Sequence, residues 1–140
     1  LVVRGGNINR ILSELYLNRS VDVLKVWGVL LQRLRPYEEL GMVGTCLTRA
    51  DLEAYNIEEG EVYELRNFLN FIADSDGICV FTERDDDSVK VSMRSRTMDV
   101  GKIAESYGGG GHARSAGFTM KNAQLLVSDD GNWKVEKKTD

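Results

Sequence analysis

Two short apolar segments on either side of an acidic stretch constrain the fold of this chain more than any other feature. Ile78–Phe81 and Val89–Arg94 have the composition of strands, and the charged stretch Asp85–Ser88 between them is typical of an exposed hairpin tip. Successive side chains of a strand point to opposite faces of the sheet. We therefore expect the second strand to have one apolar face and one polar face that carries Lys90, Ser92 and Arg94.

Helical and strand patterns alternate along the rest of the chain. Apolar residues spaced three and four apart predict helices over Asn7–Leu17, Val21–Leu34 and Gly60–Ile72. Two more helices are predicted by capping residues: one that follows the capping box Thr48–Asp51 to about Asn56, and one over Val100–Tyr107 that Asp99 caps. Further strands are expected at Met42–Leu47, Leu125–Val127 and Trp133–Val135. Together these patterns predict an α/β fold, with a mixed β-sheet, helices packed on it, and connecting helices before it.

The size and composition fit one globular domain, with room for a helical lead-in. The chain has 140 residues, of which 42% are hydrophobic and 29% are charged. No apolar run approaches the roughly 18–20 residues that cross a bilayer, so no membrane segment is expected. The start at Leu1 reads as that of an excised piece. Because the net charge is −4, any phosphate binding must come from a local cluster of basic groups.

The cysteines and carboxylates give no sign of a metal centre. Cys46 and Cys79 lie inside apolar runs, so we expect two buried thiols of a cytoplasmic protein. With a single histidine they form no recognisable zinc ligand set. The acidic residues Asp85–Asp87 are interpreted as a solvated turn. No carboxylate pair is tied to a histidine and no nucleophile stands beside a base, so we expect no catalytic residue and no metal ligand in this chain.

Four consecutive glycines, 108–111, follow the helix that is expected to end at Tyr107. A helix end needs one glycine in the left-handed conformation, so the run exceeds that need. Backbone N–H groups that carry no side chains can converge on an anion, and a following helix N-terminus would add its partial positive charge. We therefore expect Gly109, Gly110 and Gly111 to form an anion cradle. A structural loop or a flexible linker is the alternative.

The single histidine and three arginines are the candidate side chains for binding a phosphate. His112 directly follows the glycines, where its imidazole can donate a hydrogen bond to a phosphate or stack on a base. Arg94 shares a strand face with Ser92, and a guanidinium group can bind phosphate through two hydrogen bonds. Arg96 and Arg114 complete the candidate set, and exposure to water is the alternative for both.

The order of these motifs resembles a known family. Val91–Ser95 is followed by Asp99-Val100 and Ile103-Ala104, and then by Gly108–His112 and Ala116–Phe118. This succession is similar to the DHH-associated domain, the C-terminal half of DHH phosphoesterases, and especially to the branch of nanoRNases and pAp phosphatases. The resemblance spans roughly residues 8–118. After Phe118 a hairpin is expected here, where this branch usually has a helix.

The resemblance implies a two-domain enzyme that hydrolyses phosphoester bonds in short RNA or DNA or in nucleotides such as pAp. Residues 1–36 would be helices that connect to a missing N-terminal catalytic domain, and residues 37–140 would be the substrate-binding domain. The family's Asp-His-His motif, which holds a divalent metal, typically manganese, has no counterpart here. This chain alone is therefore expected to be inactive and to hold no cofactor. The glycine loop with His112, and the strand end from Ser92 to Arg94, would contact the substrate.

Two other functions stay open. The C-terminal domain of alanyl-tRNA synthetases is similar and binds nucleic acid without hydrolysis, although a more basic surface than a net charge of −4 would be expected of it. A dimerisation or regulatory domain is the third possibility, because the apolar residues of Val21–Leu34 cover more than one face of the helix. That helix could form a homodimer or pack against the missing domain.

Overall fold

The computed structural model describes residues 21–55 and 76–138 and confirms the expected mixed α/β fold. Its strands are β1 (Arg35–Tyr37), β2 (Met42–Leu47), β3 (Gly77–Glu83), β4 (Ser88–Ser95), β5 (Gly110–His112), β6 (Ser115–Lys121), β7 (Ala123–Val127) and β8 (Trp133–Lys137). Its helices are α2 (Val21–Gln32), α3 (Arg49–Tyr55) and α5 (Val100–Ser106). The helices expected over Asn7–Leu17 and Gly60–Ile72 lie outside the described residues.

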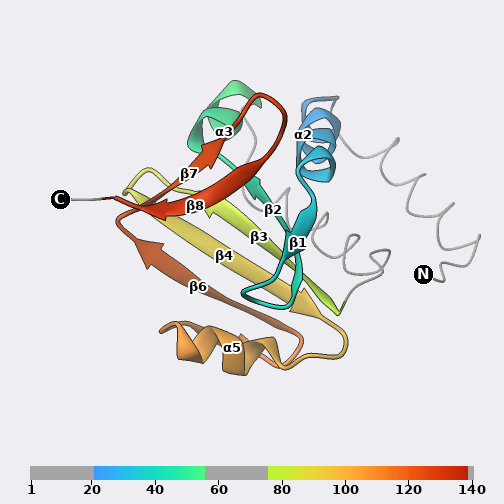
Figure 1. Cartoon of the computed structure of the whole chain (residues 1–140), viewed down its shortest axis with the longest axis vertical. Coiled ribbons are helices and arrows are strands. Elements are labelled where there is room, and N and C mark those ends of the chain that lie inside the picture. Colours follow the sequence, from blue (N-terminus) through green and yellow to red (C-terminus); the bar gives the residue numbers. More distant parts are fainter. Residues whose placement is uncertain (1–20, 56–75, 139–140) are drawn as a thin grey trace, which may run out of the picture.

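Six of the strands form one sheet in the order β1-β2-β3-β4-β6-β5, and β7 and β8 form a separate hairpin (Figure 1). Strands β2 and β3 run parallel, and the other neighbouring pairs run antiparallel. The expected hairpin is confirmed, because β3 and β4 pair antiparallel from the pair Gly77–Ser95 to the pair Glu83–Val89. The strand β5 lies at one edge of this sheet.

The helices α2 and α3 cover one face of the sheet. Buried residues of α2, among them Val26 and Leu30, pack on Leu47, Ile78 and Val80 of strands β2 and β3. The hydroxyl of Thr45 donates a hydrogen bond of 2.6 Å to the carbonyl of Leu30, which ties the helix to β2. The expected division between residues 1–36 and 37–140 stays a prediction, although α2 shares this core with the sheet.

The opposite face is covered by α5 and by the β7–β8 hairpin (Figure 1). The apolar residues of β4 that alternate with the polar ones, Val89, Val91 and Met93, all belong to this core, as expected. Trp133 anchors the hairpin, because its ring stacks on that of Tyr37 with the centroids 5.8 Å apart. Its indole N–H also donates a hydrogen bond of 2.8 Å to the carbonyl of Arg33.

The helix caps and the final hairpin that the sequence predicts are confirmed by the structure. Thr48 and Asp51 form the expected capping box, in which each side chain binds the backbone N–H of the other at 3.1 and 2.8 Å. Asp99 caps α5 by accepting a hydrogen bond from the N–H of Lys102. Leu126 and its neighbours form the expected final hairpin with Trp133 and the residues after it.

Three strands were not expected from the sequence: β1, β5 and β6. The helix α2 ends at Gln32, and Pro36, a few residues later, lies inside β1. A proline is tolerated there since β1 is an edge strand. The helix N-terminus considered after the glycine run is not found there, because the chain continues into β5 and then β6.

Candidate functional site

The strand register places the candidate side chains Arg94 and His112 on the same face of the sheet. Arg94 of β4 lies opposite Ser115 of β6, and Ser115 lies opposite His112 of β5. Directly paired residues of neighbouring strands point to the same face. Because adjacent strands are about 4.8 Å apart, the α-carbons of Arg94 and His112 are separated by about 10 Å. The three residues therefore form one polar row at this end of the sheet.

A second row without large side chains lies next to the first. Ser92 pairs with Gly117, and Gly117 pairs with Gly110. A side chain at Gly117 would collide with the carbonyl of Val91, because its β-carbon would lie 2.7 Å from that oxygen. The second row, Ser92–Gly117–Gly110, therefore carries no side chain larger than that of serine.

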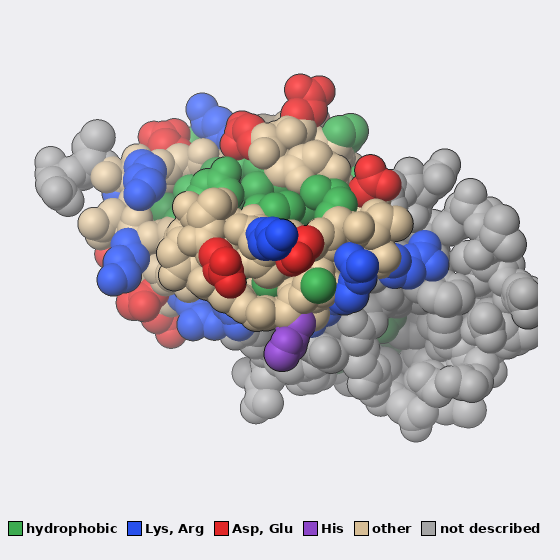
Figure 2. Space-filling view, turned by 90° about the horizontal axis from the view of Figure 1, so that it is seen from below, with side chains coloured by type: hydrophobic (Ala, Val, Ile, Leu, Met, Phe, Trp, Pro, Cys, Tyr) green, Lys and Arg blue, Asp and Glu red, His purple; other side chains and the backbone are tan. Residues whose placement is uncertain are grey.

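The two ends of the polar row differ in exposure. Arg94 is 8% exposed, whereas His112 is exposed. Ser92, which lies beside Arg94 in the second row, is 7% exposed. One guanidinium nitrogen of Arg94 donates a hydrogen bond of 3.0 Å to the carbonyl of Met93. Figure 2 shows the single histidine projecting from the surface, with Lys and Arg side chains visible on the same face. A ligand that approaches from solvent would therefore reach His112 before Arg94.

The other two candidate arginines lie at the margin of this row. Arg96 directly follows β4 and is exposed. Arg114 lies in the two-residue turn between β5 and β6, and its guanidinium donates a hydrogen bond of 2.8 Å to the carbonyl of Met98. The side chain of Arg114 therefore contacts the chain itself. The contact with substrate that the sequence suggested for Arg114 stays a prediction.

The first of the four glycines at positions 108–111 ends the helix α5. Gly108 has a φ of +85° and ends α5, since its N–H bonds to the carbonyl of Glu105 while that of Gly109 bonds to the carbonyl of Ala104. This is the Schellman arrangement, so the glycine expected at the helix end is confirmed.

The next glycines pack against the neighbouring strand. A β-carbon at Gly109 would lie 2.1 Å from the carbonyl oxygen of Gly117, and one at Gly111 would lie 2.6 Å from the carbonyl oxygen of Ser115. At Gly110 a β-carbon would meet nothing within 4 Å. Close packing therefore accounts for Gly109 and Gly111, and the absence of a side chain at Gly110 has no such cause. The anion cradle stays a prediction.

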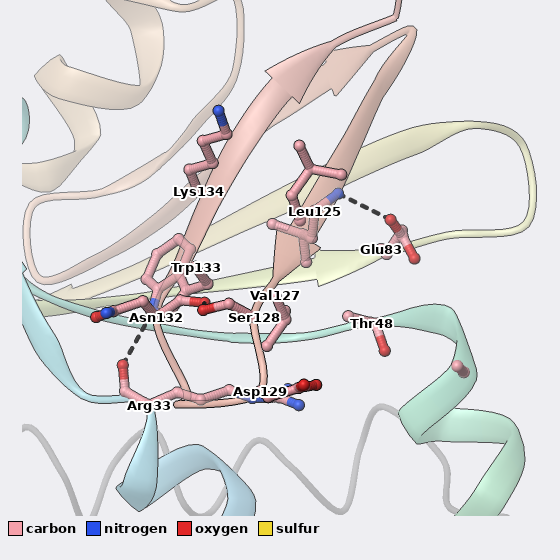
Figure 3. Close-up of a pocket in the computed structure, with 12 residues that line it drawn as sticks. Arg33, Thr48, Glu83, Leu125, Val127, Ser128, Asp129, Asn132, Trp133 and Lys134 are labelled. Carbon is pink, nitrogen blue, oxygen red and sulfur yellow. Dashed lines mark hydrogen bonds between the residues drawn. The ribbon is translucent and has the colours of Figure 1, made fainter.

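A groove of about 810 Å³ lies elsewhere, between the β7–β8 hairpin and the ends of α2 and α3 (Figure 3). It borders Glu83, the last residue of β3, which pairs with Val89. Arg94 pairs with Ile78, near the other end of β3. Five residues of strand separate these positions, or about 17 Å. The sequence gave no signal for this groove, because its walls come from segments about one hundred residues apart.

The charged groups around this groove already bind parts of the fold. The guanidinium of Arg33 forms an ion pair of 2.6 Å with Asp51. Glu83 accepts hydrogen bonds from the backbone N–H groups of Arg49 and Leu125, at 2.9 and 2.8 Å. The second of these bonds is drawn in Figure 3. These groups hold α3 and the hairpin in place, so we do not assign the groove as the binding site.

The pKa values reflect burial and ion pairing. Burial raises the pKa of Cys46 and that of Cys79 to about 12, so both thiols stay protonated near neutral pH. The buried position of both cysteines was expected and is confirmed. Burial alone would raise the pKa of Asp51, but its hydrogen bonds to Arg33 and Thr48 bring it below its ordinary value.

Within residues 21–55 and 76–138, no group of three or more His, Cys, Asp and Glu side chains is arranged to hold a metal ion. The acidic stretch at the tip of the β3–β4 hairpin bonds instead to its own surroundings, as Asp86 does to Ser88 and Asp87 to Lys138. Over the same described ranges, no helix is both long and apolar enough to span a bilayer.

The mixed sheet and its two helical faces define an α/β domain, and the glycine–histidine strand at its edge is the distinctive feature. A model of the DHHA1 domain matches residues 45–132, which is more than half of the chain. The chain therefore belongs to the DHHA1 domain family.

Comparison with solved structures supports the fold. An exopolyphosphatase-related protein from Bacteroides fragilis is similar with a TM-score of 0.64 and 21% identity, over 79% of this chain and 33% of that protein. A pGpG-specific phosphodiesterase from Vibrio cholerae gives a TM-score of 0.49 and 15% identity, over 84% of this chain and 38% of that protein, which is too low to support an argument. This chain thus spans about a third of the first structure's length. No curated protein matches the sequence.

Proposed function

We propose that this chain is the substrate-binding part of a DHH-family phosphoesterase that hydrolyses phosphoester bonds in short oligonucleotides or in nucleotides such as pAp. The polar row of Arg94, Ser115 and His112 is the observation that carries the proposal. It combines a guanidinium, a hydroxyl and an imidazole, which are all donors suited to phosphate oxygens. Membership of the DHHA1 domain family supports it.

In this proposal the residues of the chain bind and orient the substrate. His112 is exposed and contacts the phosphate first, while Arg94 adds a positive charge from its buried position in β4. Ser92, Arg96 and the backbone of Gly109–Gly111 complete the contact surface. The open space at Gly110 lets a phosphate oxygen approach the backbone closely.

The hydrolytic step itself belongs to another part of the whole protein. A divalent metal such as manganese, when bound, would supply an activated water for the attack on phosphorus. The described residues do not fit such an ion, because they contain no group of three ligands. We propose that the metal lies in an N-terminal DHH domain in cis and that the whole protein acts in the cytoplasm. In this proposal the shape of the cleft between the two domains decides the exact substrate.

Binding of pAp to the purified chain tests the proposal directly. Isothermal titration calorimetry would compare the wild type with His112→Ala, and adenosine would replace pAp to measure the need for phosphate. Loss of one hydrogen bond to a charged group costs about 1.5–3 kcal/mol, so affinity should fall by about tenfold or more. Lys134→Ala is the matched control, because it removes one charge beside the distant groove. Equal affinities for His112→Ala and the wild type would refute the site assignment.

A second measurement separates hydrolysis from nucleic-acid binding alone. The whole protein with Mn²⁺ should release phosphate from pAp or mononucleotides from a 5′-phosphorylated RNA trinucleotide. A binding module of the alanyl-tRNA synthetase type would instead bind longer RNA without cleavage, with an affinity that falls steeply as salt rises. Absence of any hydrolysis by the whole protein, together with such binding, would reject the phosphoesterase function.

A further inference from the structure

We infer that Arg114 is a positioning residue, which together with the first turn of α5 fixes His112, and that it does not contact the substrate phosphate. The inference rests on the proposed function. The guanidinium of Arg114 donates a hydrogen bond of 2.8 Å to the carbonyl of Met98, sixteen residues earlier in the chain. This bond joins the turn that follows His112 to the segment that leads from β4 into α5.

Backbone contacts hold the same turn from two sides. The N–H of Ser95, at the end of β4, donates to the carbonyl of Arg114 at 3.2 Å, and the N–H of Val100, at the start of α5, donates to the carbonyl of Ala113 at 2.9 Å. Both residues of the turn are thereby bound to elements outside the β5–β6 hairpin. The side chain of Arg114 adds a third bond to this clamp.

The first turn of α5 also contacts His112 itself. A β-carbon at Gly101 would lie 3.0 Å from the carbonyl oxygen of His112 and 3.2 Å from its carbonyl carbon. These distances, and the 3.2 Å to Oδ1 of the capping Asp99, are tighter than ordinary van der Waals contact. A side chain at Gly101 would therefore push the backbone of His112 and the cap of α5 outward. The first turn of α5 therefore fixes the position of His112 on the side that faces the helix.

The position of His112 depends on this clamp because its own strand is weak. β5 has only three residues, two of them glycine, and it lies at the edge of the sheet with all three residues exposed. An edge strand has one hydrogen-bonding partner strand instead of two. The clamp thus fixes the separation between His112 and Arg94, which a phosphate bound by both would require.

The test combines three variants with pAp binding and amide hydrogen exchange. Arg114→Ala removes the bond to Met98, and Gly101→Ala displaces His112 with no change of charge. Lys102→Ala is the control, because it removes a positive charge from α5 at a side chain outside the clamp. We expect Arg114→Ala and Gly101→Ala each to weaken pAp binding about fivefold, the effect of one ordinary hydrogen bond, and Lys102→Ala to leave it unchanged.

A double-mutant cycle with His112→Ala distinguishes positioning from direct contact. If Arg114 acts through His112, Arg114→Ala should not weaken pAp binding further once His112 is removed. If Arg114 contacts the phosphate, the two losses should add, and the dependence of affinity on salt should fall by about one charge. Additive losses with a reduced salt dependence would overturn the inference.

Hydrogen exchange reports on the clamp without any ligand. The amide protons of Ser95 and Val100 should exchange faster in Arg114→Ala than in the wild type, because they donate to the turn. Unchanged protection in Arg114→Ala would overturn the inference whether or not pAp binds. If the wild type fails to bind pAp while these amides lose protection in the variant, the proposed function fails and the clamp stands.

Discussion

Substitution of two adjacent glycines by alanine should have opposite effects on stability. At Gly109 the new β-carbon would lie 2.1 Å from the carbonyl oxygen of Gly117 and 2.6 Å from the β-carbon of Phe118. Ordinary contact begins at about 3.5 Å, so β6 would have to move by roughly 1.4 Å. At Gly110 the β-carbon would meet nothing within 4 Å, and the backbone φ there is not positive.

The expected magnitudes follow from these distances. Overpacking of a tight site costs about 1–3 kcal/mol of stability. Because Gly109 faces backbone atoms, which cannot move aside as a flexible side chain can, we expect Gly109→Ala to lower the free energy of unfolding by about 3 kcal/mol. Since 1 kcal/mol shifts the melting temperature of a chain of this size by about 3–4 °C, Gly109→Ala should melt about 10 °C lower. Gly110→Ala should keep the wild-type stability or gain up to about 1 kcal/mol, because alanine restricts the unfolded chain.

Thermal and urea unfolding of the two variants, followed by pAp titration, measures both consequences. If the backbone of Gly110 approaches the phosphate, Gly110→Ala should weaken pAp binding although its stability is retained. Wild-type stability of Gly109→Ala would show that β6 does not pack against the glycine run as described. Unchanged pAp affinity of Gly110→Ala would refute the anion cradle and leave close packing as the reason for the glycines.

The remaining predictions concern the elements that hold the sheet together. Glu83→Gln should lower the free energy of unfolding by about 1–3 kcal/mol in urea denaturation, because its carboxylate accepts two backbone N–H groups, one from α3 and one from β7. Asp51 has a folded pKa below its unfolded value. Its ion pair with Arg33 should therefore stabilise the fold above about pH 4 and lose this effect as the pH falls through the folded pKa. Asp51→Asn should destabilise the chain at pH 7 and have a smaller effect at pH 3, and equal effects at both pH values would contradict this. Cys46 and Cys79, whose pKa values are about 12, should react with a thiol reagent at pH 8 only after unfolding, and rapid labelling of the native chain would refute their burial.

The features that the sequence predicted correctly are those with a short-range cause. The alternation of β4 shows which of its faces is apolar, because neighbouring strand residues point in opposite directions. The capping box of Thr48 and Asp51 and the helix-ending Gly108 depend on residues within a few positions of each other. The α/β class followed from counting such local elements.

The strands that the sequence failed to predict have no periodic pattern of their own. β5 consists of two glycines and a histidine and is a strand only because β6 binds it. β1 contains Pro36, which is compatible with a strand because one side of β1 has no partner in the sheet. The 810 Å³ groove joins Arg33 to Lys134, and no spacing along the chain could indicate this contact.

The sequence by itself determined which chemical groups are present: the glycine run, one histidine, and the polar residues Lys90, Ser92 and Arg94, which alternate with apolar residues along a strand. Only the tertiary structure decided that Arg94, Ser115 and His112 form one row, because this row depends on the pairing of β4 with β6 and of β6 with β5. Strand pairing is a contact between distant segments, and its register is set by the packing of the whole sheet between its two cores. A shift of one residue would have turned these side chains to opposite faces.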